Sequence, residues 1–346
     1  MSWFDDGPTL ADRMRQHAGK QQHLYGELMR AMATDWEAGG AVREICRGWE
    51  DAPRGSVVQL RLLAGLFRIV LTDRAPELVP FYPCLGGTRP PHKAWPAVRD
   101  VLAANVEELH EALLIAPQTN EAGRSTALLV GLFEAVRRTG LRRVQLLEPG
   151  ASAGLNLLVD KFRFVHAGWA FGPASSPLQL ANVVVGATTP EPFEIVQRRG
   201  CDLSPVDAST PDGQLRLRSF VWPFQVERHV RLAQALEIAA ESPVTVERAA
   251  AGEWLEHELA QPLPEDVLTV VWQSITKLYW PAQETARVDD AILQAASSRP
   301  VAHLAMEYPT VSASSAELTL TGLDGAAVTR LATVGDHGTP VTIAPR

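Results

Sequence analysis

The chain has 346 residues, of which 46% are hydrophobic and 21% are charged. This length is enough for two ordinary domains, each with its own hydrophobic core. The net charge of −8 argues against a nucleic-acid partner, because phosphates attract a basic surface. No stretch approaches the roughly 20 apolar residues that a membrane-spanning helix needs, so we expect no membrane association. The N-terminus lacks the basic and apolar segments of a signal peptide, which predicts a cytoplasmic location.

Cysteine and histidine are not spaced as disulfide partners or metal ligands. The three cysteines, Cys46, Cys84 and Cys201, lie far apart and form no C-x-x-C pair. The nine histidines show neither H-x-H nor H-E-x-x-H spacing. We therefore expect no metal. The expected partner is a small-molecule substrate, and a homodimer is left open.

Residues 1–118 show the periodicity of helices. Apolar residues recur at helical spacing over Leu10–Trp36 and more densely over Val57–Leu71. A further helix is expected over Ala94–Leu114, and the glycine and proline residues of Phe81–Pro91 indicate a fixed loop. Nothing alternates as a strand would. The sequence therefore predicts an all-helical N-terminal domain, 1–118.

After Pro117, short apolar runs alternate with helical stretches, which is typical of a mostly parallel sheet covered by helices. Strands are expected at Val144–Glu148, Phe193–Gln197, Val244–Glu247, Val267–Trp272 and Val301–Met306. Helices are expected at 124–138 and 226–240, an irregular insertion at 162–180, and a terminal antiparallel hairpin from Glu317–Thr321 and Pro340–Ala344. We place the Val144 strand centrally, beside the Val267 strand. Residues 119–346 would form this second, α/β domain.

A glycine-containing loop follows the Val144 strand. The strand ends in Glu148, and Gly150, Ser152 and Gly154 then alternate before a new helix begins. This pattern matches the acid-x-G-x-G-x-G loop of S-adenosylmethionine enzymes, with Ser152 at the middle glycine position. Such a turn brings backbone atoms against the methionyl group, where larger side chains would collide, and the acid meets the cationic amino group. The alternative is a tight strand-to-helix turn that binds nothing.

Two other ligand-binding loops are excluded by their spacing. A dinucleotide-binding loop requires G-x-G-x-x-G, but position 152 is serine and position 155 is leucine. A phosphate-binding P-loop requires Gly-Lys-Ser/Thr, but Gly154 is followed by Leu155 and Asn156. The loop therefore favours S-adenosylmethionine as the cofactor.

A second acid, Asp202, follows the second expected strand. In S-adenosylmethionine-binding sheets, an acid at this position accepts hydrogen bonds from both ribose hydroxyls. The interval between Glu148 and Asp202 is long, and the insertion would absorb it. The alternatives are that Asp202 caps the turn before Pro205, or that Asp207 takes the ribose instead.

Several segments together resemble a bacterial family that is catalogued as a domain of unknown function and thought to have the methyltransferase fold. They are Gln118–Arg124, Leu147–Leu158, Gly200–Asp207, Trp222–Arg228 and His337–Gly338, and the Phe81–Pro91 loop is also similar. The resemblance supports a Rossmann-like class I methyltransferase sheet with a C-terminal antiparallel hairpin, preceded by an all-helical N-terminal domain. It implies no particular reaction. After the third strand such enzymes often have Gly-Asp-Ala, whose Asp lies near the adenine amino group. Here the run is Ala249–Trp254, and Glu253 would replace that Asp.

Candidate substrate-facing residues follow the Val267 strand. The catalytic candidates are Tyr279 and Gln273 from this region, together with His229 as a base if the acceptor must lose a proton. Tyr279 or Trp222 would face the sulfonium through a cation–π contact, unless Trp222 is a core residue. The Asn/Asp-Pro-Pro-Tyr motif of nitrogen methylases is absent from the sequence, which disfavours DNA or protein glutamine as the acceptor.

Polar residues also surround the start of the 124–138 helix. Thr119 or Asn120 would be its N-cap, and Arg124 would hold the methionyl carboxylate. The alternative is capping with an ion pair that links the domains. Arg228 and Arg231 lie three apart on one helix face, where they would bind an acidic substrate or simply be exposed. The full set of expected cofactor contacts is Asn120, Arg124, Glu148, Gly150, Ser152, Gly154, Asn156, Asp202, Leu203, Glu253, Gln273 and Ser274.

Three functions remain open from the sequence. The leading hypothesis is transfer of the S-adenosylmethionine methyl group to a small molecule, with the helical domain covering the cleft. A second enzyme reaction uses the methionyl γ-carbon, in aminocarboxypropyl transfer or in ring closure that releases methylthioadenosine. The third is a non-catalytic interaction protein that retains the fold.

Overall fold

A computed structural model of the protein describes residues 8–118, 120–310, 313–323 and 327–345. The chain divides into two compact units. The first comprises Met1–Thr119 and Gln214–Val230, and the second comprises Asn120–Gly213 and Arg231–Arg346. The sequence analysis placed residues 214–230 in the second domain, whereas in the structure they join the helical unit. Within the described ranges, no helix is long and apolar enough to cross a membrane.

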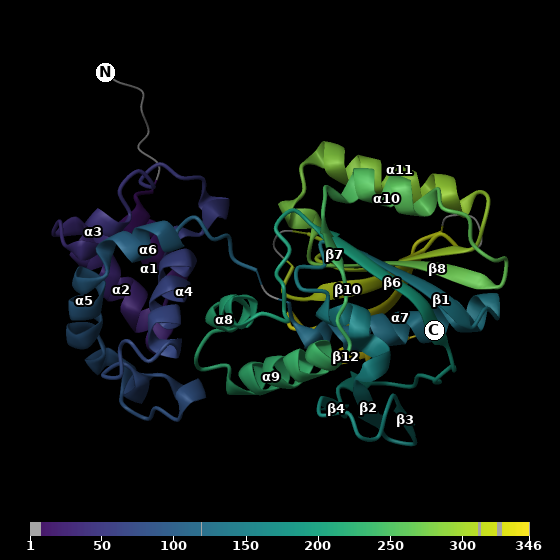
Figure 1. The fold of residues 1–346 in the computed structure, drawn as a ribbon, viewed down its shortest axis with the longest axis horizontal. Coiled ribbons are helices and arrows are strands. Elements are labelled where there is room, and N and C mark those ends of the chain that lie inside the picture. Colours follow the sequence, from purple (N-terminus) through teal and green to yellow (C-terminus); the bar gives the residue numbers. More distant parts are fainter. Residues whose placement is uncertain (1–7, 119, 311–312, 324–326, 346) are drawn as a thin grey trace. The chain divides into compact units, whose positions relative to one another are not determined.

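The first unit is helical (Figure 1). Its helices are α1 (Leu10–Ala18), α2 (Leu24–Glu37), α3 (Ala41–Ile45), α4 (Val58–Leu71), α5 (Trp95–Ala104) and α6 (Val106–Ala112), with most of α8 (Pro211–Ser219) and the start of α9 (Val226–Glu241). Short 3-10 turns η1 (Arg54–Ser56), η2 (Val79–Phe81), η3 (Pro83–Leu85) and η4 (Pro91–Lys93) connect them. No strand occurs among the described residues up to 118, as the sequence predicts.

Two helices that were expected to be continuous are each split. α1 ends at Gly19, whose φ of 49° is easy for a residue without a Cβ. α2 then starts with His23 as its N-cap, because the imidazole Nδ1 accepts a hydrogen bond from the Gly26 N–H. The helix expected over 94–114 breaks at Asn105, which separates α5 from α6.

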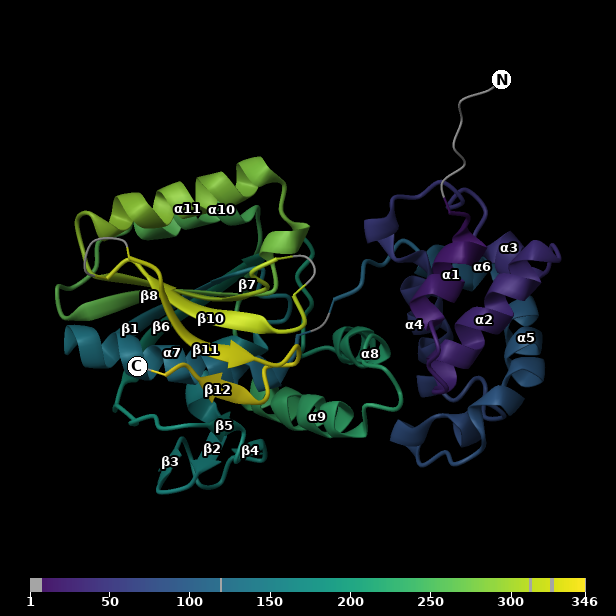
Figure 2. The same ribbon diagram turned by 180° about the vertical axis from the view of Figure 1, so that it is seen from behind.

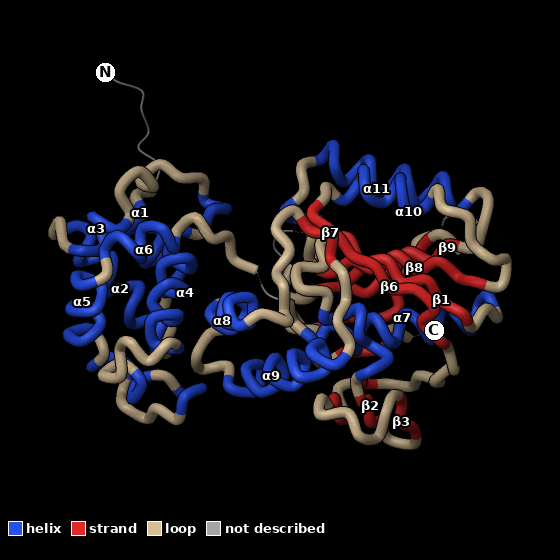
Figure 3. The backbone as a smooth tube through the Cα atoms, in the orientation of Figure 1, coloured by secondary structure: helices blue, strands red, loops and turns tan. Residues whose placement is uncertain are grey.

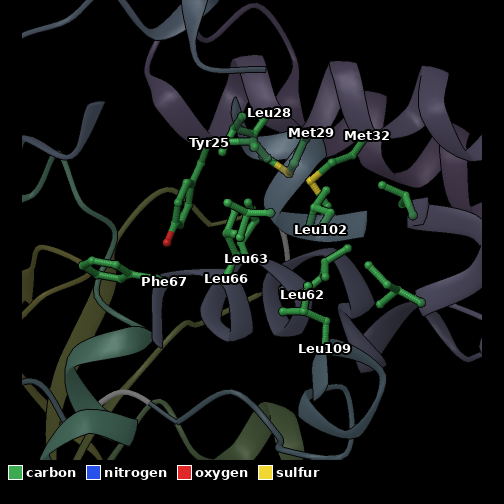
Figure 4. Packing of buried hydrophobic residues seen from close by; sticks show 14 of the residues in the cluster. Tyr25, Leu28, Met29, Met32, Leu62, Leu63, Leu66, Phe67, Leu102 and Leu109 are labelled. Carbon is green, nitrogen blue, oxygen red and sulfur yellow. The ribbon is translucent and has the colours of Figure 1, made fainter. Parts of the chain in front are cut away.

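The core of the first unit is made of apolar side chains from α1 to α6. Figure 4 labels members of this core from α2, α4, α5 and α6. Met29 and Met32 of α2 pack with Leu63 and Leu66 of α4, and all four are buried. Full burial of such a side chain contributes about 1.5–3 kcal/mol. The Cys84 N–H donates a hydrogen bond of 3.0 Å to the carbonyl of Pro223, which joins the 214–230 segment to this unit.

The second unit contains a nine-stranded, mostly parallel sheet in the order β5-β12-β11-β10-β9-β8-β1-β6-β7. Five neighbouring strands are parallel, from β7 (Val246–Arg248) at one edge through β6 (Glu194–Asp202), β1 (Arg143–Pro149) and β8 (Val267–Ser274) to β9 (Val301–Glu307). β1 therefore lies centrally beside β8, as predicted. Every residue of β8 is buried, as expected for a parallel strand covered on both faces.

Helices cover both faces of this sheet (Figure 3). α7 (Ser125–Thr139) packs on one face, and α10 (Ala251–Leu259) and α11 (Ala282–Ala296) pack side by side on the other. The 3-10 turns η5 (Ala122–Arg124) and η7 (Lys277–Tyr279) lie just before α7 and between β8 and α11. The result is a mixed α/β unit whose central strands all run in one direction.

The C-terminal end of the sheet differs from the expected hairpin. β10 (Ala316–Thr321) and β12 (Val341–Ile343) are not neighbours, because β11 (Thr329–Val334) lies between them and pairs antiparallel with both. The two-residue strand β5 (Val184–Val185) then pairs parallel with β12 at the edge. The expected hairpin is thus a three-stranded antiparallel meander, and the strand over 329–334 was missed.

The segment between β1 and β6 also differs from its prediction. The insertion expected to be irregular contains β2 (Arg163–His166), β3 (Trp169–Phe171) and β4 (Gln179–Ala181), which form a separate three-stranded sheet. Its aromatic residues Trp169 and Phe171 pack edge-on against Phe133 of α7. The helix expected after the glycine loop is the 3-10 helix η6 (Leu155–Lys161).

Candidate functional site

The loop after β1 has three residues in the left-handed region of the backbone. Gly150, Ser152 and Gly154 have φ values of 76°, 55° and 73°. Serine rarely adopts this conformation, so the fold must hold Ser152 there. Hydrogen bonds supply that restraint, because the Gly150 and Ala151 N–H groups both donate to the carbonyl of Cys201 in β6, at 2.8 and 2.9 Å.

Neighbouring side chains account for the two glycines. A Cβ added at Gly150 would lie 2.6 Å from Cγ2 of Thr276, and one at Gly154 would lie 2.6 Å from Cγ2 of Val244. Both separations are far inside van der Waals contact. Packing within the protein therefore requires glycine at both positions. The sequence analysis had explained these glycines by the close approach of a ligand.

Glu148 occupies the end of β1 and is 2% exposed. Its Oε1 accepts a hydrogen bond of 3.4 Å from Nδ2 of Asn156, whereas its Oε2 has no hydrogen-bond partner among the described residues. Burial raises the pKa of Glu148 to about 8, although the Asn156 amide and the positive charge of Arg124 oppose that rise. A buried acceptor without a donor is costly. Glu148 is therefore largely protonated at neutral pH, and a cationic donor next to Oε2 would favour its ionised form.

Asp202 lies at the end of the neighbouring strand β6 and is half-buried. Its Oδ2 accepts a hydrogen bond of 3.0 Å from the Ser152 N–H, and its Oδ1 accepts one of 2.8 Å from the Ser204 N–H. The second of these is the local turn bond that was considered as the alternative role for Asp202. Asp207 makes an equivalent turn of its own with Ser209, on the exposed surface.

Residues at and just before the start of α7 are hydrogen-bonded to η6, which directly follows the loop. Oδ1 of Asn120 accepts a hydrogen bond of 2.8 Å from the Leu155 N–H, and the Ser125 hydroxyl donates one of 2.9 Å to Oδ1 of Asn156. Nη1 of Arg124 donates to the carbonyl of Ser274 at the end of β8, at 3.0 Å. The start of α7 thus joins the ends of β1 and β8. Asn120 is not the N-cap that was predicted, because α7 is preceded by Arg124 and η5 by Glu121 at that position, and Thr119, the other candidate cap, lies outside the described residues.

At the end of β8, Gln273 is fully buried and both ends of its amide are used. Its Nε2 donates to Oε1 of Glu307 at 3.1 Å, and its Oε1 lies 2.9 Å from Nε2 of His303. The same Glu307 oxygen accepts from the N–H and hydroxyl of Thr276, at 3.0 and 3.2 Å. Gln273, one of the catalytic candidates, therefore positions the turn that follows β8.

Two candidate residues are strongly exposed. Tyr279 in η7 is 74% exposed, and Leu203 directly after β6 is 71% exposed. The Leu203 carbonyl accepts a hydrogen bond from Arg248. Glu253 is also exposed, in the first turn of α10. These three residues are placed after or beside strands as expected, but their contacts with a ligand stay predictions.

The sequence analysis missed a tyrosine at the end of β9. Tyr308 follows Glu307, and its hydroxyl donates a hydrogen bond of 2.9 Å to Oδ1 of Asp336. Burial and the hydrogen bond to Asp336 together raise the pKa of Tyr308 to about 12, and the nearby Arg124 opposes the rise. The available signal was its position, since polar residues at the carboxyl ends of parallel strands line the ligand crevice of open α/β sheets.

His229 and Trp222 belong to the first unit. The ring of His229 packs edge-on against Phe67, and burial lowers its pKa to about 4. The Trp222 ring contacts the rings of His23 and Tyr25. Trp222 is therefore part of an aromatic cluster within that unit. This agrees with the alternative prediction that Trp222 is a core residue.

The two arginines of α9 have different partners. Arg228, in the first unit, hydrogen-bonds through Nη1 to the side chain of Gln225. Arg231, in the second unit, forms an ion pair of 2.8 Å with Glu121, whose Oε1 also accepts from the Gly123 N–H. The segment before α7 does form an ion pair, but Glu121 and Arg231 both belong to the second unit, so this pair does not link the domains as the alternative interpretation proposed.

Within each unit, segments on which the family resemblance was based contact one another. The loop after β1 contacts the end of β6 through Ser152 and Asp202. A Cβ added at Gly338 would lie 2.2 Å from the backbone nitrogen of Arg124, so the His337–Gly338 segment packs directly on the start of α7. In the first unit, the Phe81–Pro91 loop is hydrogen-bonded to Pro223.

The fold and these residues together form a candidate ligand-binding site at the switch point of an open α/β sheet. The strand order reverses between β1 and β8, and polar residues at the ends of β1, β6, β8 and β9 surround that point. Open α/β sheets bind ligands at such a switch point. No cluster of three or more metal-ligating side chains is found in the part of the chain that the structure describes.

Comparison with known proteins places the chain in a family. It belongs to the family described as uncharacterized proteins conserved in bacteria (DUF2332), whose model matches residues 9–343. No curated protein and no solved structure matches the chain.

Proposed function

We propose that the protein is an S-adenosylmethionine-dependent methyltransferase that acts on a small molecule. One observation carries the proposal. The carboxyl group of Glu148 is buried at the switch point of the sheet, with Oε2 lacking a partner among the described residues, beside a loop held in left-handed conformation. A cationic donor that binds this oxygen would stabilise the ionised carboxylate and would supply the missing hydrogen bond.

The pair Glu148 and Arg124 suits the methionyl end of the cofactor. That group is a zwitterion, with an ammonium next to a carboxylate. Arg124 lies close enough to Glu148 for its charge to lower the pKa of that acid, and its Nη1 hydrogen-bonds to Ser274 at the end of β8. In this proposal the ammonium donates to Oε2 of Glu148, and the guanidinium of Arg124 binds the carboxylate.

Asp202 suits the ribose. Its two backbone hydrogen bonds fix the carboxylate at the end of β6, next to the loop. A carboxylate oxygen has two lone pairs, so each oxygen can accept a second hydrogen bond, from a ribose hydroxyl. The bonds to Ser152 and Ser204 then orient the acid, and they do not conflict with its role in binding.

Little chemistry is required of the protein beyond binding. The cofactor supplies a methyl group that is already activated, and the acceleration comes from orientation and from the exclusion of water. A base is needed only for an acceptor that must lose a proton.

Titration calorimetry with S-adenosylmethionine and S-adenosylhomocysteine tests the proposal. Both should bind, and both should raise the melting temperature, because they bind the native state. If neither binds at millimolar concentration while circular dichroism shows folded protein, the cofactor assignment is wrong. Ordered density for NAD over the loop in a soaked crystal would also contradict it.

A product assay separates the reactions. The protein is incubated with labelled S-adenosylmethionine and a metabolite extract, and the nucleoside product is identified by mass spectrometry. S-adenosylhomocysteine is expected. Methylthioadenosine would indicate attack at the γ-carbon instead. Tight binding with no turnover in any extract would favour an interaction protein.

A further inference from the structure

The second unit contains a cavity of about 710 Å³ away from the glycine loop. It lies between α11, β9 and β10, at the border of the sheet surface that α11 covers. In Figure 2, β10, β11 and β12 continue the sheet away from α10 and α11, so the helical layer does not extend over these strands. His303 and Ala305 of β9 and Thr319 and Thr321 of β10 line the cavity. Its volume falls in the range of about 300–1,000 Å³ that is usual for small-molecule sites.

The cavity is lined largely by apolar groups. α11 contributes Ile292, Leu293 and Ala296, β9 contributes Ala305, and Val328 completes the rim. Leu293 and Val328 are 61% and 67% exposed, although leucine and valine are usually buried. Contact with an apolar ligand would remove both side chains from water, at about 25 cal/mol per Å² of surface covered.

The charged groups in the lining compensate each other. Nζ of Lys277 lies 3.1 Å from Oδ1 of Asp289, and both residues line the cavity. Because the two charges neutralise each other, a charged ligand would find no uncompensated opposite charge in this pair. The lining thus favours a molecule without charge.

One imidazole gives the cavity a hydrogen-bond acceptor. Nε2 of His303 lies 2.9 Å from Oε1 of Gln273. Because the Gln273 amide nitrogen donates to Glu307, its oxygen must accept from His303, which places the imidazole proton on Nε2. Burial lowers the pKa of His303 to about 4, so the ring is neutral. Nδ1 is then an acceptor, with the Thr321 hydroxyl at a long 3.4 Å.

The same hydrogen bonds extend from the cavity to the glycine loop. His303 binds Gln273, Gln273 binds Glu307, and Glu307 binds the N–H of Thr276. The methyl group of Thr276 packs on Gly150. A ligand that fixes the position of His303 would therefore also stabilise the hydrogen bonds that hold Thr276 against the glycine loop.

We propose that this cavity binds a small, uncharged, mostly apolar molecule that carries one hydrogen-bond donor, and that the donor binds Nδ1 of His303. The site is separate from the switch point and does not depend on the proposed methyltransferase activity. It is the binding site of a second ligand.

Three probes of similar shape test the proposal on the full chain without cofactor. They are 4-methylphenol, toluene and 4-methylbenzoate, and binding is followed by ligand-observed NMR and by crystal soaking. 4-Methylphenol should bind about 3–10-fold more tightly than toluene, as expected from one added hydrogen bond. 4-Methylbenzoate should bind more weakly than either. Preference for the benzoate would overturn the proposal, as would density for 4-methylphenol outside the cavity.

Two tryptophan variants on one helix provide the matched control. Ala296 is half-buried in the lining, so Ala296→Trp should fill the cavity and abolish binding of 4-methylphenol. Gln294 is exposed on the same helix and does not line the cavity, so Gln294→Trp should leave binding unchanged. Circular dichroism establishes that both variants are folded. Equal affinity in the two variants would overturn the proposal.

A third variant tests the acceptor. His303→Phe should retain toluene binding but remove the preference for 4-methylphenol over toluene. If that variant fails to fold, Thr321→Val, which leaves Nδ1 without its long hydrogen bond from Thr321, should increase the preference for 4-methylphenol. An unchanged preference in the folded variant would show that His303 is not the partner.

Discussion

The backbone N–H of Ser152, in the loop after β1, donates a hydrogen bond of 3.0 Å to Oδ2 of Asp202 at the end of β6. Oδ1 of the same carboxylate accepts from the Ser204 N–H at 2.8 Å. One side chain thus joins the loop to the end of the neighbouring strand. A change at position 202 should therefore act both on the conformation of the loop and on any ligand that the loop holds.

Asp202→Ala should weaken S-adenosylmethionine binding by at least about tenfold, because each hydrogen bond to a charged group contributes roughly 1.5–3 kcal/mol and every 1.4 kcal/mol is a factor of ten. The variant should also have a lower free energy of unfolding, since two backbone donors lose their acceptor. Calorimetry measures the first effect and urea denaturation the second. The variant should remain folded, because Asp202 is only half-buried.

Asp207→Ala is the matched control for this change. Asp207 also accepts a backbone hydrogen bond two residues on, from Ser209, but it lies on the exposed surface. Its removal should leave the affinity for S-adenosylmethionine nearly unchanged. The opposite pattern, with binding lost on changing Asp207 and kept on changing Asp202, would assign the ribose contact to Asp207.

Glu148→Gln should change how stability depends on pH. The folded protein raises the pKa of Glu148 from 4.5 to about 8, so between these values the folded state binds more protons than the unfolded state. Stability contributed by this group is therefore full below pH 4.5 and is lost as pH rises through 8. Relative to the native protein, Glu148→Gln should become more stable as pH rises from 5 to about 9.

Urea denaturation across this pH range measures the difference, and Glu134→Gln is the control. The ion-paired arginines Arg137 and Arg138 hold the pKa of Glu134 below its usual value, so its titration lies below pH 5. Its replacement should leave the slope between pH 5 and 9 unchanged. Parallel slopes for the native protein and Glu148→Gln would contradict a buried, protonated Glu148.

The sequence predicts most of the α/β core because its strands carry strong signals. The β8 run of Val267–Trp272 is apolar except for Thr269, and β1 contains the apolar residues Val144, Leu146 and Leu147, as is usual for strands buried on both faces. Glu148 and the glycines could be located because the strand ends abruptly in an acid and a turn. The small sheet gave no such signal, since β3 and β4 have only three residues each.

The remaining differences arise from contacts between distant segments. Nothing local in residues 214–230 indicates that they join the helical unit, because their membership depends on contacts such as the Cys84–Pro223 hydrogen bond. The roles of Asp202 and Gln273 were incompletely predicted for the same reason. Their hydrogen-bond partners, Ser152 and His303, lie far away in the sequence.

Tyr82→Phe should stabilise the protein. The Tyr82 side chain is fully buried, stacked on Phe67, and its hydroxyl has no hydrogen-bond partner among the described residues. A buried hydroxyl without a partner costs about 1–3 kcal/mol, so its removal should raise the free energy of unfolding by roughly 1 kcal/mol. Chemical denaturation measures this change.

Tyr308→Phe provides the comparison, because the Tyr308 hydroxyl donates to Asp336. That variant should lower the free energy of unfolding by about 0.5–1.5 kcal/mol, the usual worth of one hydrogen bond. Loss of stability in Tyr82→Phe would mean that its hydroxyl is satisfied, for example by a buried water molecule.

Gly150→Ala should destabilise the protein for two separable reasons. The φ of Gly150 is 76°, where a Cβ costs roughly 1–2 kcal/mol. The new Cβ would also lie 2.6 Å from Cγ2 of Thr276, whose hydroxyl and N–H are held by Glu307. Thr276→Ser removes that methyl group and keeps both hydrogen bonds. A double-mutant cycle by urea denaturation should therefore show that Thr276→Ser recovers part of the loss, with a coupling of about 1 kcal/mol, while the cost of the positive φ remains. Additive effects of the two substitutions would mean that Thr276 does not pack on the loop, and the contact between the ends of β1 and β8 would then have to be placed elsewhere.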